Sequence, residues 1–192
     1  MGIGYCLIRV EPATVAALRG RPRAAAEFIY RDADAYDAGR TGLFTRLFGK
    51  KVRAPEPVPE RREGDEIDLD KAWHIVHYLL TGATDRAEGP LRLIGDDLDP
   101  LADLDLGLGR PNVISVRDVQ AFTAAAKGLD QDAFLARFIP NEMPLDELYL
   151  GEVIARGDHE DMKEYATENF HILRDFVQLA ADEGDAIITY YT

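Results

Sequence analysis

The sequence predicts a single α+β domain in which a small, mostly antiparallel sheet is packed with several helices. Short apolar segments rich in β-forming residues lie near both ends of the chain, at residues 3–10 and 186–191. Between them, residues 68–82 and 159–183 show the periodicity of amphipathic helices. A chain of 192 residues can bury a substantial core, and its length favours one domain. We therefore expect the first and last segments to share one sheet that both helices cover.

Composition places the chain among ordinary globular proteins of the cytoplasm. Hydrophobic residues make up 46% and charged residues 30% of the sequence. No apolar run approaches the roughly 18 residues that span a membrane, and the N-terminus lacks the basic and small-residue pattern of a signal peptide. The single cysteine, Cys6, excludes an intrachain disulfide.

The formal net charge of −13 bears on the partners of the protein. Such a field repels nucleic-acid phosphates and anionic membrane surfaces, so we expect neither as a partner. It favours a basic protein partner, although negative charge also serves solubility alone.

The N-terminal elements follow from side-chain alternation and proline placement. Alternation within residues 3–10 puts Cys6 on the opposite face of a strand from Tyr5. A cysteine in such a strand is more often a small buried hydrophobe than a nucleophile. Pro12 and Pro22 each suit the first turn of a short helix.

The least regular part of the chain is residues 31–66. Its last part, about residues 54–66, is rich in proline and charge and predicts an exposed, flexible loop. It does not predict a domain boundary, because too little chain precedes it to form a separate core.

Residues 68–82 form the clearest amphipathic pattern, and they contain the only tryptophan and two of the four histidines. Asp68 is a natural N-cap, and Gly82 supplies a left-handed stop. Trp73 belongs to the apolar arc. The opposite, polar arc includes His74, His77 and Tyr78.

The polar arc contains a weak candidate for a metal site. Asp70, His74 and His77 follow i, i+4 and i+7 spacing, and both residue types can bind zinc or iron. The segment lacks the Glu of the His-Glu-x-x-His motif, and no other strong ligand cluster completes the site. In the favoured interpretation His77 borders the apolar arc and finds a backbone acceptor, while His74 faces solvent. We therefore expect no metal and no cofactor.

The middle of the chain predicts a short strand at Leu91–Ile94, an acidic loop and a further strand at Val113–Val116. Clustered carboxylates can bind calcium or magnesium, but the EF-hand spacing fails because Ala102 stands where glycine is required. The alternative is that Asp96 and Asp97 accept backbone N–H groups in an Asx-type turn. The acidic residues of the loop are Asp96, Asp97, Asp99, Asp103 and Asp105.

The C-terminal half predicts helices with recognisable starts. Ser115 and Asp118 resemble a capping box, and Asp130 is a natural cap for the next helix. Asn169 falls on the apolar face of the helix expected at 159–183. A buried amide needs partners, so we expect it to bond a loop or strand backbone, with a role in a pocket as the alternative.

Four segments, in order, resemble the signature of the YfbM-like family of small bacterial proteins, which contain a domain of unknown function. The resemblance implies a single α+β domain in the bacterial cytoplasm and supplies no catalytic residues. The chain departs from the family pattern at residues 99–105, which precede a Gly-Leu-Gly-Arg-Pro segment where the family runs almost directly into a Gly-Tyr-Gly-Pro-like one. The four segments are MGIGYCL (1–7), DLDKAWHIVHYLLTG (68–82), IGDDL (94–98) and GDAIITYY (184–191).

The sequence leaves the biochemical function open between two hypotheses. It contains no dinucleotide or P-loop phosphate motif, no nucleophile elbow and no Cys-x-x-Cys, which argues against an enzyme. The leading hypothesis is an acidic binding module that recognises a basic protein partner, for example an immunity-type protein that neutralises a basic toxin. The alternative is an enzyme, or a small-ligand or metal-binding protein. Its site would lie around Trp73, His74, His77, Tyr78, Asp96 and Asp97.

Overall fold

The computed structural model describes residues 2–31, 57–92, 94, 98–105 and 107–192, and within them it confirms the predicted α+β fold. One sheet has the strand order β2-β1-β5-β4-β3, and every neighbouring pair is antiparallel. Its strands are β1 (Tyr5–Val10), β2 (Glu66–Asp68), β3 (Asp99–Pro100), β4 (Asn112–Ile114) and β5 (Ala186–Tyr191).

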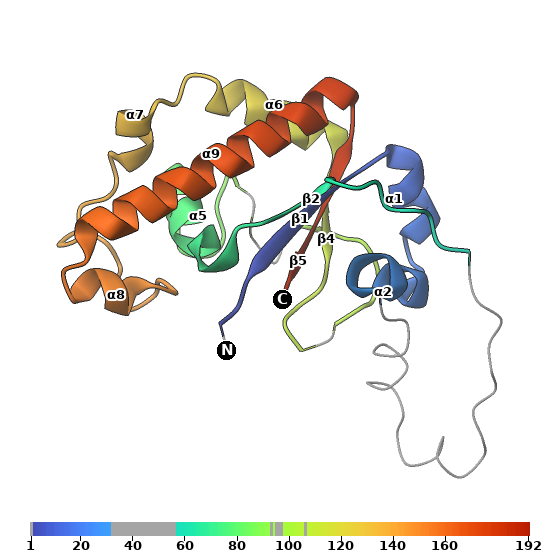
Figure 1. Ribbon diagram of the computed structural model, residues 1–192, viewed down its shortest axis with the longest axis horizontal. Helices are drawn as coiled ribbons and strands as arrows, with labels where there is room; N and C mark the ends of the chain where they lie inside the picture. Colours follow the sequence, from blue (N-terminus) through green and yellow to red (C-terminus); the bar gives the residue numbers. More distant parts are fainter. Residues whose placement is uncertain (1, 32–56, 93, 95–97, 106) are drawn as a thin grey trace, which may run out of the picture.

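The first and last strands, β1 and β5, belong to one sheet, as predicted, and the structure shows that they are direct neighbours in it. Their register runs from Tyr5 opposite Tyr191 to Val10 opposite Ala186. Beyond them, the backbone of Gly4 exchanges hydrogen bonds of 3.0 and 3.1 Å with that of Thr192. The two ends of the chain therefore lie side by side (Figure 1).

Helices cover both faces of the sheet (Figure 1). Alternate residues of β1 belong to different cores: Leu7 packs with α5, α6 and α9, while Ile8 packs with α1 and α2. The strands β1 and β5 are each buried on both faces, which explains their nearly continuous apolar sequences. The helices are α1 (Pro12–Leu18), α2 (Pro22–Tyr30), α5 (Trp73–Thr81), α6 (Val116–Ala126), α7 (Gln131–Leu135), α8 (Gly151–Ala155) and α9 (His159–Glu183).

Several helix boundaries follow the predicted capping chemistry. The Ser115 hydroxyl accepts the backbone N–H of Asp118 at 3.2 Å at the start of α6. Asp130 accepts the backbone N–H of Ala133 at 2.8 Å at the start of α7. Gly184, with φ 74°, ends α9 in the left-handed conformation. No helix among the described residues is long and apolar enough to cross a membrane.

The helix expected from Asp68 begins later, at Trp73. Asp68 belongs to β2, where it lies opposite Cys6, and its carboxylate accepts the backbone N–H of Asp70 at 2.7 Å. Asp70 has φ 44°, which interrupts a continuous α-helix, and a 3₁₀ turn at Asp70–Ala72 leads into α5. Because β2 pairs with β1 as far as Asp68, this residue, predicted as the helix N-cap, belongs to a strand instead.

The strand predicted at Leu91–Ile94 is absent: the described residues of that segment, Leu91, Arg92 and Ile94, lie in no strand. The edge strand next to β4 is instead β3, in which Asp99 lies opposite Val113. Ile94 is buried in the core beside α5 and α6, so its apolar character reflects packing and not sheet pairing.

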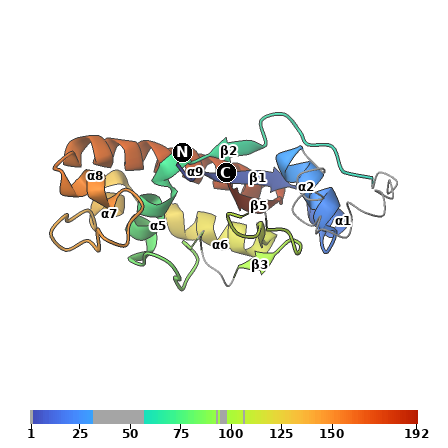
Figure 2. The same ribbon diagram turned by 90° about the horizontal axis from the view of Figure 1, so that it is seen from below.

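The described part of the predicted 54–66 loop, from residue 57 onward, is tied to the sheet by ion pairs. The guanidinium of Arg9 on β1 lies 2.5 Å from Asp65. Arg62 lies 2.5 Å from Asp65 and 2.6 Å from Asp185. Both carboxylates are buried, at 4% and 2% exposure. These residues and Glu183, which lies 3.1 Å from Arg9, are called the ion cluster below: Arg9, Arg62, Asp65, Glu183 and Asp185. Figure 2 shows β1, β2 and α9, the elements around this cluster.

Candidate functional site

The two histidines of α5 are held in structural hydrogen bonds. His74 Nε2 bonds the carbonyl of Thr84, and its Nδ1 accepts the backbone N–H of Tyr149 at 3.1 Å. Since Nδ1 accepts, the proton lies on Nε2 and neither nitrogen is free to bind a metal. His77 Nε2 donates to the carbonyl of Asp85 at 2.9 Å, which confirms the expected backbone acceptor. His74, expected in solvent, is half-buried.

Burial sets the protonation of both imidazoles. Desolvation lowers the pKa of His77 to about 4, although its bond to the Asp85 carbonyl acts in the opposite direction. Desolvation also lowers the pKa of His74. Both rings are therefore neutral near pH 7.

The structure does not bring together Asp70, His74 and His77, the weak candidate for a metal site. Asp70 accepts a hydrogen bond of 2.8 Å from the hydroxyl of Tyr165, away from the histidine bonds described above. In the described part of the chain, no three His, Cys, Asp or Glu side chains are grouped to hold a metal ion. Asp96 and Asp97, the other members of the predicted site, lie outside the described residues.

The remaining predicted site residues divide between the core and a pocket. Tyr78 packs against the core and does not line the pocket. Asn169 is buried and donates to the carbonyl of Tyr165 at 2.9 Å, one turn earlier in α9, and not to a loop or strand as expected. Cys6 is also buried, which raises the pKa of its thiol to about 11 and argues against a nucleophile. Of the predicted site residues that the structure describes, only Trp73 lines the pocket described below.

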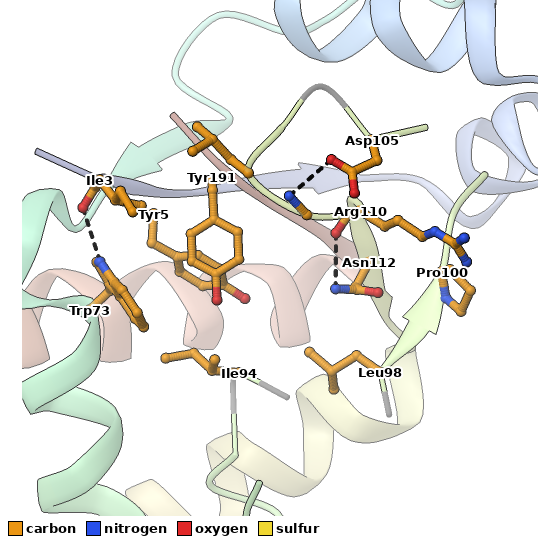
Figure 3. A pocket seen from close by; sticks show the side chains of 12 residues that line it. Ile3, Tyr5, Trp73, Ile94, Leu98, Pro100, Asp105, Arg110, Asn112 and Tyr191 are labelled. Carbon is orange, nitrogen blue, oxygen red and sulfur yellow. Dashed lines mark hydrogen bonds between the residues drawn. The ribbon is translucent and has the colours of Figure 1, made fainter. Parts of the chain in front are cut away.

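A pocket of about 510 Å³ lies beside Trp73, where β1, β5 and β4 meet the start of α5. Figure 3 shows aromatic side chains at one end of this Trp73 pocket and polar side chains at the other. The aromatic end comprises Tyr5, Trp73 and Tyr191. The polar end comprises Asp105, Arg110 and Asn112, while Ile94 and Leu98 lie across from the rings.

The aromatic end is built by sheet register. Tyr5 and Tyr191 are directly opposite on β1 and β5, and their ring centroids are 4.9 Å apart. The Trp73 ring meets Tyr191 edge-on with the ring centroids 5.4 Å apart, and it stacks on the His74 ring at 4.6 Å. The indole N–H donates to the carbonyl of Ile3 at 3.0 Å, which fixes the ring against the start of the chain. The rings therefore present a preformed surface to the pocket.

The polar end is organised by a turn that contains two glycines. Asp105 Oδ1 accepts the backbone N–H groups of Gly107 at 2.8 Å and Gly109 at 3.2 Å. Both glycines have left-handed φ values, 103° and 107°, which other residues rarely adopt. Asn112 on β4 donates from Nδ2 to the carbonyl of Arg110 at 3.1 Å. These bonds hold Asp105 and Asn112 at the same pocket.

Sequence reasoning identified one pocket residue, Trp73, and missed the others as site residues. A signal for Tyr5 and Tyr191 was present, because antiparallel pairing of the first and last strands brings the start of one beside the end of the other. For Asn112 and Arg110 no comparable signal existed, since the position of β4 beside β5 is a property of the assembled sheet.

Comparisons with known proteins identify the family of the chain and agree with its fold. The chain belongs to the family described as Domain of unknown function (DUF1877), whose model matches residues 1–190. A solved structure, the protein of unknown function YfbM from Escherichia coli, is similar over 99% of both chains, with a TM-score of 0.53 and 15% identity. That likeness shows the fold alone. No curated protein matches the chain.

Proposed function

We propose that the protein is a cytoplasmic small-ligand-binding protein and that the Trp73 pocket is its binding site. The observation that carries this proposal is a pocket of about 510 Å³ with an aromatic end and a polar end. This volume lies within the range typical of small-molecule sites, and a mixture of apolar surface and a few polar groups is their usual lining.

The chemistry of the surroundings favours binding over catalysis. His74 uses both ring nitrogens in hydrogen bonds, so it is not poised as a general base. Burial strongly raises the pKa of Tyr5, which therefore stays a neutral phenol. Cys6 is held as a buried thiol on β1. These groups suit a fixed recognition surface better than proton transfer.

The test is a ligand-observed NMR screen of small ring-containing fragments against the wild type and two variants. We expect fragments to bind the wild type and to lose binding in Tyr191→Ala, which removes one ring of the pocket. Tyr30→Ala is the matched control, because Tyr30 contacts Tyr190 and does not line the pocket. Thermal unfolding confirms that both variants are folded. Equal binding to Tyr191→Ala, or none to the wild type, would contradict the proposal.

A second proposal, recognition of a basic protein partner, is supported by the exposed face of α9. Acidic residues recur along it at helical spacing, and Ile172 and Leu179 between them are each 45% exposed. Such a face complements a basic amphipathic segment, in keeping with the net charge of −13. An immunity-type protein is one form of this proposal. The exposed carboxylates are those of Asp161, Glu164, Glu168, Asp175 and Asp182.

Charge reversal tests this second proposal. Affinity capture from lysate at low salt should recover a basic protein with the wild type and not with Glu164→Lys/Glu168→Lys, and high salt should release it. The double variant Glu142→Lys/Asp146→Lys changes the net charge equally but leaves α9 intact. If it loses the partner to the same extent, the α9 face is not the recognition surface.

A further inference from the structure

The polar end of the Trp73 pocket offers hydrogen-bond acceptors without partners. Asp105 uses Oδ1 for the two glycine N–H groups, while within the described residues its Oδ2 accepts no hydrogen bond. Asn112 uses its Nδ2 donor for the carbonyl of Arg110, and its Oδ1 has no described partner. Carboxylate and amide oxygens only accept, so Asp105 Oδ2 and Asn112 Oδ1 are both complementary to a donor.

Among the described residues, Arg110 is the one cation that lines the pocket, and it is engaged with a carboxylate of its own. Its guanidinium lies 3.3 Å from Asp103, which does not line the pocket. Figure 3 shows Arg110 extending away from the aromatic rings. Its positive charge is therefore offset, while Asp105 keeps its negative charge. The net charge of −13 on the whole chain adds an attractive field for cations.

The opposite end of the pocket is suited to a ring. The faces and edges of Trp73 and Tyr191 are fixed by contacts with His74 and Tyr5. Fixed aromatic surfaces pack favourably against planar or apolar groups, and they also attract positive charge. Both ends of the pocket thus tolerate a cation, and neither favours an anion.

Resting on the proposed function, we infer that the ligand of the Trp73 pocket is an organic cation, a ring-bearing amine or guanidine. Its nitrogen donates to Asp105 Oδ2 and Asn112 Oδ1, and its ring packs against Trp73 and Tyr191. The free acceptors and the offset of Arg110 by Asp103 carry this inference.

Three probes of nearly equal size and different charge test the ligand class: phenethylamine, 2-phenylethanol and 3-phenylpropanoate. Binding is measured by ligand-observed NMR titration at low salt and confirmed by chemical shifts of the Trp73 indole. We expect phenethylamine to bind most tightly and 3-phenylpropanoate most weakly, because only the amine carries a positive charge toward Asp105.

Two charge-neutralising variants locate the effect. Asp105→Asn keeps an oxygen for Gly107 and Gly109 but removes the charge, so amine binding should weaken roughly fivefold, the scale of an exposed ion pair. Asp132→Asn is the matched control, since it removes the same charge from an exposed residue of α7 that does not line the pocket. Binding of 2-phenylethanol should be nearly equal in the wild type and Asp105→Asn.

The outcomes separate the two proposals. If the alcohol or the carboxylate binds as tightly as the amine, or if Asp105→Asn and Asp132→Asn weaken the amine equally, the inference of a cationic ligand is overturned while the pocket remains a binding site. If no probe binds in a manner that depends on Tyr191, the proposed function falls together with it.

Discussion

His77 shows what burial does to one side chain. Its ring is only 1% exposed and is held by the carbonyl of Asp85. In the unfolded chain the imidazole takes up a proton near pH 6.5, whereas in the folded protein it stays neutral until the pH falls to about 4. Between these values the unfolded state binds more protons, so acidification favours unfolding. The difference corresponds to about 3 kcal/mol at most.

We therefore expect His77→Gln to reduce the acid sensitivity of the fold. Gln can still donate to the Asp85 carbonyl, but it cannot take up a proton. The free energy of unfolding of the wild type should decrease between pH 6.5 and pH 4 more steeply than that of the variant. Chemical denaturation at four pH values measures both curves. Parallel curves would show that His77 contributes nothing to the acid response.

Single-residue predictions succeeded where the reason was local. Ser115 and Asp130 cap their helices because the cap needs only a side chain and the next turn. His74 was misplaced because its partners, the loop carbonyl of Thr84 and the distant N–H of Tyr149, come from other parts of the chain. Spacing along α5 contains no information about either.

Among the elements, the ion cluster joins β1 to the junction of α9 and β5. Arg9 on β1 is 7% exposed and lies 2.5 Å from Asp65 and 3.1 Å from Glu183. Its guanidinium also lies 5.9 Å from the centroid of the Phe176 ring on α9. Removing Arg9 leaves the buried Asp65 with Arg62, whose side chain is 44% exposed, as its remaining cation among the described residues, and weakening a buried ion pair in this way is costly.

Arg9→Met should therefore lower the free energy of unfolding by about 3 kcal/mol. The control is Arg19→Met, because Arg19 also pairs with a carboxylate, Asp99 at 2.7 Å, but both side chains are about half exposed. That change should cost less than about 1 kcal/mol. Urea unfolding of both variants provides the comparison. Similar costs for the two would mean that burial of the cluster adds no stability.

At the element scale, the C-terminal helix and strand were predicted with the greatest accuracy. The helix at 159–183 and the strand at 186–191 match α9 and β5, because Gly184 separates a helical period from a run of β-forming residues. The strand predicted at Leu91–Ile94 was wrong, because a short apolar run is equally consistent with a buried coil. Predicting the pocket from the sequence would have required both the exact element boundaries and the order of the strands in the sheet.

For the whole molecule, the sequence predicted the class of fold and the shared sheet, but not the order of its strands. The presence of the first and last segments in one sheet followed from their apolar character, but their direct pairing did not. The placement of β4 and β3 beyond β5 did not, and that placement brings Asn112 toward Trp73. The candidate site is therefore a property of the assembled sheet more than of any motif.

The adjacency of β1 and β5 has a consequence for synthesis of the protein. β1 is synthesised before every other described element, but the neighbour that pairs with it along its full length, β5, is synthesised only after α9. Until then, the apolar residues of β1 have no complete partner, and contacts of such long sequence separation form slowly. Until residues 186–191 have been synthesised, the described strand that can pair with β1 is the three-residue β2, so β1 is exposed to aggregation during that interval.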